Sequence, residues 1–200
     1  MEYLEGQTVK DLFESIGPVP PRRAVRIIKQ ICAALIDAHG ADLVHRDLKP
    51  SNLFLVADQM GGEYVKILDF GVVKQMDVEQ DVTLPGATLG SPLYMSPEQV
   101  LGKHSIDERS DVFSMGVVLY EMLALREPFR GRTVRQTFEN ILHDDPQPLR
   151  ESAPERGIPE SLEAIVLKAI AKDPSGRHQS MVELIDGLES VRRDLSLDGR

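Results

Sequence analysis

Four polar residues in two short segments of the sequence have the types that phosphoryl transfer requires. Asp47, Lys49 and Asn52 fall within one stretch of six residues, and Asp69 follows 17 residues after Asn52. A carboxylate can orient a hydroxyl and accept its proton, a lysine can balance phosphate charge, and amide and carboxylate oxygens are ligands that Mg²⁺ accepts. Each residue alone is more often a turn former or a solvated charge. Their significance therefore depends on whether the fold brings them together.

The segments that flank these residues predict how they are held. Before them, apolar residues recur at three- and four-residue steps over 21–40, which predicts a long helix. After Asn52, the apolar runs 53–56 and 64–68 are joined by a segment that contains a glycine pair, and this pattern predicts a small hairpin. A hairpin would return the chain to its starting point, so it would let Asp69 meet Asn52 around one metal ion.

The remainder of the sequence predicts helices separated by loops that contain proline or glycine. A helix capped by Asp107 or Ser110 is apolar on nearly every side, so it belongs in the middle of a domain. The polar stretch 75–90 has no sustained period and is typical of a long functional loop. Amphipathic helices are expected over 8–17, 133–143, 159–172 and 179–193. With seven or so helices and one hairpin, the expected fold class is mainly α.

The composition favours one folded domain and excludes several classes of function. The 200 residues are 42% hydrophobic and 28% charged, as in globular proteins. With 32 acidic and 23 basic residues the net charge is −9, so no nucleic acid is expected among the partners. The single cysteine, Cys32, excludes a disulfide framework and is expected in the core. Every apolar run is shorter than the roughly 18 residues of a membrane span, so no membrane segment is expected.

Four segments together resemble the signature motifs of eukaryotic-type protein kinases. They are HRDLKPSN (45–52), DFG (69–71), GSPLYMSPE (90–98) and DVFSMG (111–116), in the order in which that family has them. Lys49 resembles the serine/threonine branch, and the phrase SPEQ resembles bacterial members. The resemblance implies a kinase-like C-terminal lobe that uses ATP and Mg²⁺, or Mn²⁺, to phosphorylate serine and threonine residues of proteins.

The resemblance also implies a role for each polar residue of the first two motifs. Asp47 would be the catalytic carboxylate that faces the substrate hydroxyl, and Lys49 would balance phosphate charge. Asn52 and Asp69 would be the metal ligands. Phe54 would form the floor beneath the adenine ring. The contacts to the nucleotide would come from Glu2, Leu4, Lys49, Asn52, Phe54 and Asp69.

Other residues are implied in regulation and in positioning the substrate. Arg46 resembles the arginine that pairs with a phosphorylated loop residue in some kinases, and Thr83 and Thr88 lie in the loop that would carry the phosphate. The alternative is that both threonines are ordinary exposed loop hydroxyls. Ser91 stands where the family usually has threonine, and its hydroxyl could hydrogen-bond to Asp47 and Lys49.

Several residues have structural interpretations. By resemblance, Glu98 and Arg177 are expected to form a buried ion pair, and Asp111 is expected to accept hydrogen bonds from the backbone of the HRD segment. His45 and Phe70 are expected in the core. The other histidines have no ligand-like spacing and no function is assigned to them; they are His39, His104, His143 and His178.

The sequence lacks the β-rich lobe with which kinase domains of this family open. It contains neither a G-x-G-x-x-G loop nor a V-A-I-K-like strand. Residues 1–7 are therefore expected to be a remnant of the hinge between lobes, 8–193 the C-terminal lobe and 194–200 a tail. The partners would be protein substrates and the missing N-terminal lobe, and the chain by itself is expected to have little or no activity.

Two functions of different class follow from this absence. In the first, the chain is the catalytic lobe of a serine/threonine kinase, located in the cytoplasm or in the cytoplasmic part of a membrane-anchored kinase. In the second, it is a truncated, non-catalytic docking or decoy module. The sequence retains Asp47, Lys49, Asn52 and Asp69, which argues against a long-standing loss of chemistry and favours the first.

Overall fold

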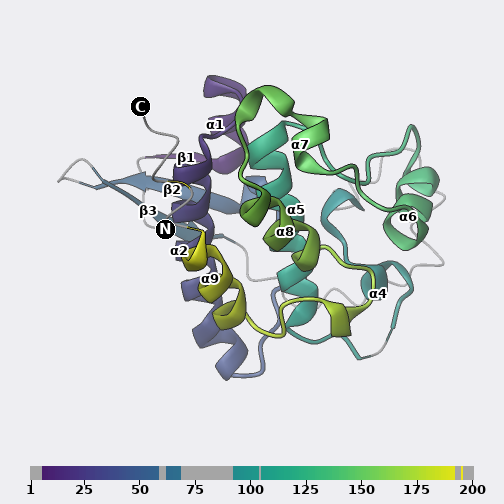
Figure 1. Ribbon diagram of the computed structural model, residues 1–200. Coiled ribbons are helices and arrows are strands. Elements are labelled where there is room, and N and C mark those ends of the chain that lie inside the picture. The colour runs from purple at the N-terminus through teal and green to yellow at the C-terminus, as the bar shows by residue number, and fades with distance from the viewer. Residues whose placement is uncertain (1–5, 59–61, 69–91, 104, 192–194, 196–200) are drawn as a thin grey trace.

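The protein is a bundle of helices with a small antiparallel sheet on one side (Figure 1). The computed structural model describes residues 6–58, 62–68, 92–103, 105–191 and 195. Eight α-helices in these residues confirm the mainly α class. They are α1 (Val9–Ile16), α2 (Pro21–Gly40), α4 (Pro97–Val100), α5 (Arg109–Ala124), α6 (Val134–His143), α7 (Leu149–Ser152), α8 (Glu160–Ala169) and α9 (Met181–Ser190). The strands are β1 (Gly6–Thr8), β2 (Leu53–Ala57) and β3 (Glu63–Ile67), and the 3₁₀ turns are η1 (Pro50–Asn52), η2 (Pro92–Tyr94), η3 (Pro154–Arg156) and η4 (Pro174–Gly176).

The first two helices begin and end where the sequence predicts. Thr8 and Asp11 cap α1 reciprocally: the Thr8 hydroxyl accepts from the Asp11 N–H at 3.0 Å, and the Asp11 carboxylate accepts from the Thr8 N–H at 2.9 Å. Proline at the first position begins α2, where it removes a hydrogen-bond donor that has no partner in the helix. Cys32 is fully buried on the apolar face of α2, and burial raises the pKa of its thiol to about 12, so its expected place in the core is confirmed.

The sheet has one strand more than the hairpin that the sequence predicts. β2 and β3 pair antiparallel, with Leu55 opposite Val65, and β1 pairs with the other edge of β2. Gly6 lies so close to β2 that a Cβ atom there would overlap the carbonyl oxygen of Leu55, so glycine is what permits this pairing. Arg23 of α2 forms an ion pair with Glu63 at 2.7 Å, which fastens the hairpin to the helix bundle.

α5 is the central helix and is buried on nearly every side, as its apolar sequence predicts. The expected cap is observed in part. The residue at the N-cap position is Glu108, whose side chain makes no capping hydrogen bond. Asp107, one of the two expected caps, accepts from the backbone N–H of Arg109, the first residue of the helix, at 3.0 Å, and its carboxylate also accepts from the guanidinium of Arg109. The other expected cap, Ser110, lies inside the helix.

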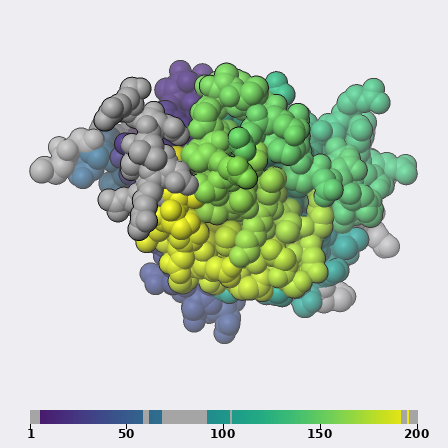
Figure 2. All heavy atoms as spheres, in the orientation of Figure 1, coloured from purple at the N-terminus to yellow at the C-terminus, as the bar shows by residue number. Residues whose placement is uncertain are grey.

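The C-terminal helices cover the central helices on one face of the molecule: α7 and α8 pack against α5, and α9 packs against α2 and α8. Residues of α7, α8 and α9, coloured green to yellow, form most of the surface that faces the viewer in Figure 2. The helices expected over 133–143, 159–172 and 179–193 are observed as α6, α8 and α9. α4 and α7 have four residues each, too few for a periodic pattern, and were not predicted. Within the described part of the chain, no helix has the length and apolar character needed to cross a membrane.

Candidate active site

The loop between α2 and β2 brings Asp47, Lys49 and Asn52 together. The Nζ atom of Lys49 donates to Oδ2 of Asp47 at 2.7 Å. The side-chain amide of Asn52 donates to the same oxygen at 3.2 Å and to the main-chain carbonyl of Asp47 at 2.9 Å. The Asp47 side chain is 47% exposed, whereas Asn52 is buried. The loop thus presents an oriented carboxylate to solvent, with a cation beside it.

The side-chain amide of Asn52 is oriented by its hydrogen bonds to Asp47. Because its NH₂ group donates to Asp47, its side-chain carbonyl oxygen points away from that residue. The N–H of Leu68 donates to the main-chain carbonyl of Asn52 at 2.8 Å, so the chain returns to Asn52 after β3, as the hairpin predicts. Asp69 is the next residue in the sequence and lies outside the described residues. An amide oxygen in this position fits the hard oxygen donors that Mg²⁺ accepts.

Asp111 holds the catalytic loop from α5, as expected. Its fully buried carboxylate accepts from the backbone N–H of His45 at 2.8 Å and from that of Arg46 at 2.9 Å. His39, at the end of α2, places Nε2 at 2.8 Å from Oδ2 of Asp111. These three contacts compensate a carboxylate that would be costly to bury alone. No role for His39 was expected from the sequence, because its partner Asp111 lies 72 residues away along the chain.

Glu98 and Arg177 form the expected buried ion pair. Two parallel hydrogen bonds join them, from Nη1 to Oε1 at 2.7 Å and from Nη2 to Oε2 at 2.9 Å. The hydroxyl of Ser110 donates to Oε1 of Glu98 at 2.5 Å. Burial acts to raise the pKa of Glu98, but the hydrogen bonds from Arg177 and Ser110 outweigh it and hold the pKa below its ordinary value. The pair therefore stays charged at neutral pH and fastens α4 to the segment before α9.

A second polar cluster links η2 to α5. The hydroxyl of Tyr94 donates to Oε2 of Glu121 at 2.6 Å, and the hydroxyl of Ser114 donates to the main-chain carbonyl of Tyr94 at 2.8 Å. Burial is the main cause that raises the pKa of Glu121 to about 7; the nearby Glu127 carboxylate acts in the same direction, and the hydrogen bond from Tyr94 and the charge of Arg130 oppose it. This cluster was not expected from the sequence, because its members come from three separate segments.

Many of the predicted site residues lie outside the described residues, so their roles stay predictions. They are Glu2, Leu4, Asp69, Thr83, Thr88 and Ser91. Phe70, expected in the core, and His104, to which no function was assigned, also lie outside the described residues. The domain limits at residues 7 and 193 likewise stay predictions. Phe54 is described: it lies in β2 opposite Thr8 of β1 and is half-buried. Its place on the sheet beside the catalytic loop is compatible with the expected contact to a nucleotide.

The other described histidines differ in burial. His45 is buried as expected, and burial lowers its pKa. His178 is also buried, its pKa is lowered by burial, and its Nε2 lies 3.4 Å from the carbonyl oxygen of Ile165. His143 is exposed and lies 3.8 Å from Glu139. The contact of His143 lies within α6, whereas His178 reaches α8 from the segment before α9.

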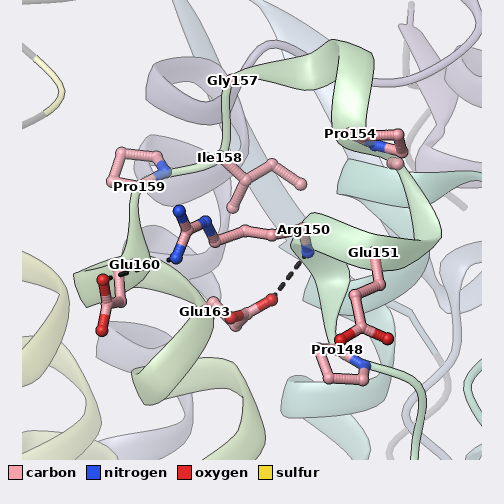
Figure 3. A pocket seen from close by; sticks show the side chains of 10 residues that line it. Pro148, Arg150, Glu151, Pro154, Gly157, Ile158, Pro159, Glu160 and Glu163 are labelled. Carbon is pink, nitrogen blue, oxygen red and sulfur yellow. Dashed lines mark hydrogen bonds and ion pairs between the residues drawn. The ribbon is translucent and has the colours of Figure 1, made fainter.

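A surface pocket lies between α7, η3 and the start of α8 (Figure 3). Ile158 and Pro159 form part of its wall, and Arg150, Glu160 and Glu163 supply charge. The backbone N–H of Arg150 donates to Glu163 at 2.7 Å, and its guanidinium lies 3.4 Å from Glu160. These contacts join α7 to α8, and no residue of the catalytic loop lines the pocket. We therefore assign its polar side chains to helix packing rather than to the site around Asp47.

Sequence comparison relates the chain to kinases. Residues 1–186 match the protein kinase domain family. The chain is 40% identical over 186 residues to serine/threonine-protein kinase PknB of Mycobacterium tuberculosis, an alignment that covers 92% of this chain and 28% of PknB. It is 35% identical over 197 residues to serine/threonine-protein kinase pkn3 of Myxococcus xanthus, covering 97% of this chain and 36% of pkn3. The chain thus spans about a third of the length of these relatives.

Solved kinase structures share the fold. A crystal structure of Rad53 in complex with AMP-PNP superposes with a TM-score of 0.74 and 25% identity, covering 94% of this chain and 45% of that chain. The kinase domain of PknI from Mycobacterium tuberculosis gives a TM-score of 0.68 at 22% identity, covering 95% of this chain and 63% of that chain. From its sequence match and its fold, the chain belongs to the protein kinase family, in the bacterial-like serine/threonine branch.

Proposed function

We propose that this chain is the catalytic lobe of a kinase that transfers the γ-phosphate of ATP to serine and threonine hydroxyls of proteins when an N-terminal lobe is present. The observation that carries the proposal is the convergence of Lys49 and Asn52 on one exposed oxygen of Asp47, at 2.7 and 3.2 Å. These two donors together fix the direction of the second carboxylate oxygen, Oδ1, which accepts from neither of them.

Asp47 and Lys49 would divide the work on the substrate. Asp47 would accept a hydrogen bond from the incoming hydroxyl, orient it toward the phosphorus atom and take up its proton late in the transfer. Lys49, whose side chain is 19% exposed, would keep its ammonium group beside the carboxylate and stabilise the negative charge on the transferred phosphate. Both side chains would thus be oriented before the substrate arrives, which reduces the entropy lost on the way to the transition state.

Asn52 and Asp69 would hold Mg²⁺, or Mn²⁺, together with the phosphates of ATP. A bound divalent ion would neutralise charge on the β- and γ-phosphates. The support from this structure is that the Asn52 amide oxygen points away from Asp47 and that Leu68, the residue before Asp69, is hydrogen-bonded to Asn52. Phe54 would support the adenine ring, and Glu2 and Leu4 would complete the contacts to the nucleotide.

The remaining roles concern regulation and partners. Arg46 is exposed, so its guanidinium can pair with a phosphate on Thr83 or Thr88. Ser91 would position the substrate through a hydrogen bond to Asp47. The partners would be protein substrates and the N-terminal lobe, and ATP dependence makes the cytoplasm the expected location.

The test is the exchange Asp47→Asn in a kinase that includes the N-terminal lobe. We expect phosphorylation of a protein substrate to fall by about 100-fold or more, because the variant loses the base but keeps the shape of the side chain. Asp42→Asn is the matched control: Asp42 is an exposed residue of the same loop with φ of 57°, a conformation that asparagine tolerates. Retained activity of the Asp47 variant would remove Asp47 from its role. Absence of phosphoryl transfer in the unsubstituted two-lobe protein would favour the docking module instead.

A further inference from the structure

The backbone immediately before Asp47 has a conformation that needs support. Arg46 has φ of 66°, in the left-handed region. For a residue with a Cβ atom this conformation costs about 1–2 kcal/mol, so it persists only where neighbouring groups hold it in place. Because the peptide between Arg46 and Asp47 sets the direction in which the Asp47 side chain leaves the backbone, whatever holds this peptide also aims the carboxylate.

Hydrogen bonds hold that peptide at both of its edges. The carbonyl of Arg46 and the N–H of Asp47 belong to one planar unit and point in opposite directions. The N–H of Asp47 donates to Nδ1 of His45 at 3.3 Å, a long bond. The carbonyl of Arg46 accepts from Nε2 of Gln99 at 2.7 Å, a short one. Gln99 is thus the firmer of the two supports, and it comes from α4, 53 residues away in the sequence.

The side chain of Gln99 is itself fixed by the cap of α4. Its Oε1 atom accepts from the backbone N–H of Ser96 at 2.9 Å, and its backbone N–H lies 3.4 Å from the Ser96 hydroxyl, which together form a capping box. With the oxygen of the amide engaged by Ser96, the NH₂ group must face the carbonyl of Arg46. The neighbouring residue Glu98 anchors the same helix through its buried pair with Arg177.

We propose that Gln99 is a positioning residue for Asp47, an inference that rests on the proposed function. Its amide links α4, the helix that follows segment 69–91, to the peptide that aims the catalytic carboxylate. If Gln99 served only to cap α4, the exchange Gln99→Glu would have little effect on Asp47. Glutamate also accepts a hydrogen bond from Ser96, so capping tolerates Gln99→Glu, whereas the bond to the carbonyl of Arg46 requires a donor.

The decisive experiment is Gln99→Glu in the two-lobe kinase, since this exchange keeps the acceptor and removes the donor. We expect kcat to fall by about 10- to 100-fold, because a misplaced catalytic group costs rate, while KM for ATP changes by less than about twofold. Gln136→Glu is the matched control, because Gln136 is the third residue of α6 and accepts from the backbone N–H of Arg132 at 3.1 Å. A Gln99→Glu enzyme with kcat within twofold of the control, or with kcat lost only in proportion to folded protein, would overturn the proposal.

A second measurement separates this inference from the proposed function. In the 200-residue chain, whose activity is not needed here, the backbone amide resonance of Asp47 is followed by NMR. We expect Gln99→Glu to shift that resonance and to speed its hydrogen exchange, and Gln136→Glu to do neither. An unchanged Asp47 amide would refute the link to Gln99 even in an active kinase. A shifted amide in a protein without phosphoryl transfer would retain the link and reject the proposed function.

Discussion

Replacing Arg177 with methionine removes every hydrogen bond that the buried guanidinium makes. Its N–H groups donate to both oxygens of Glu98 at 2.7 and 2.9 Å, and to the main-chain carbonyls of Ala171 at 2.7 Å, Arg109 at 3.0 Å and Lys172 at 3.0 Å. Methionine is unbranched and flexible, so it can fill much of the same space, but it donates to none of these oxygens. The exchange therefore removes the ion pair and three hydrogen bonds to main-chain carbonyls with little change in packing.

The loss of stability follows from what remains buried. In the described residues, the side chains that donate to Glu98 are those of Arg177 and Ser110, so after Arg177→Met the hydroxyl of Ser110 remains. Breaking one side of a buried ion pair costs about 3–5 kcal/mol, because the other charge is left uncompensated. Native domains have a total stability of about 5–15 kcal/mol, so the change is a large part of the whole. With a urea dependence of about 2 kcal/mol per molar, the unfolding midpoint should fall by about 1.5–2.5 M.

The assay is urea unfolding followed by circular dichroism, with an exposed ion pair as control. Lys168 and Glu183 approach to 2.5 Å, but their side chains are 45% and 41% exposed, so Lys168→Met should cost less than about 1 kcal/mol. The double variant Glu98→Leu/Arg177→Met should lose less than the sum of its two single variants, because no buried charge is left. If Arg177→Met costs no more than Lys168→Met, the reasoning about the buried pair is wrong.

Two further predictions concern stability. Leu125 follows the last residue of α5 with φ of 53° and is 42% exposed. Leu125→Gly should relieve the left-handed strain and raise the stability by about 1 kcal/mol, which corresponds to a rise in Tm of about 2–4 °C. An unchanged or lower Tm would show that the leucine side chain contributes more to stability than the strain costs. Burial raises the pKa of Glu121 from 4.5 to about 7, so the folded state keeps a proton that the unfolded chain releases, and the contribution of Glu121 to stability falls as pH rises through that window. The stability of Glu121→Gln relative to the unsubstituted protein should therefore be about 2 kcal/mol higher at pH 8 than at pH 5, as measured by urea unfolding at each pH. The same stability difference at pH 5 and at pH 8 would contradict the raised pKa of Glu121.

Much of the local structure could be predicted from the sequence because the signals are local. Each of these signals acts over a few residues: the cap at Thr8, the proline at the start of α2 and the spacing of the apolar residues within the two helices. The observed helices begin and end at the predicted residues. The glycine pair between two apolar runs likewise predicts β2 and β3. The motif residues Asp47, Lys49 and Asn52 lie in one loop, so their proximity also follows from their spacing.

Features that depend on distant partners could not be predicted. β1 has three residues and no pattern of its own, and it exists because Gly6 allows it to approach β2. Ser110 was wrong as a candidate cap of α5, because it lies inside the helix and its hydroxyl donates to Glu98 of α4. α4 and α7 are too short to show a period, yet α4 carries two residues that reach other parts of the chain.

The family, the identity of the candidate catalytic residues and the limits of the long helices could be read from residue types at short spacing. The contact of His39 with Asp111 and that of Gln99 with Arg46 span 72 and 53 residues of chain, and they became visible only in the folded protein. The physical reason is that a hydrogen bond depends on distance and direction in space. For residues so far apart, both are set by how α2, α4 and α5 pack together and not by any pattern along the chain.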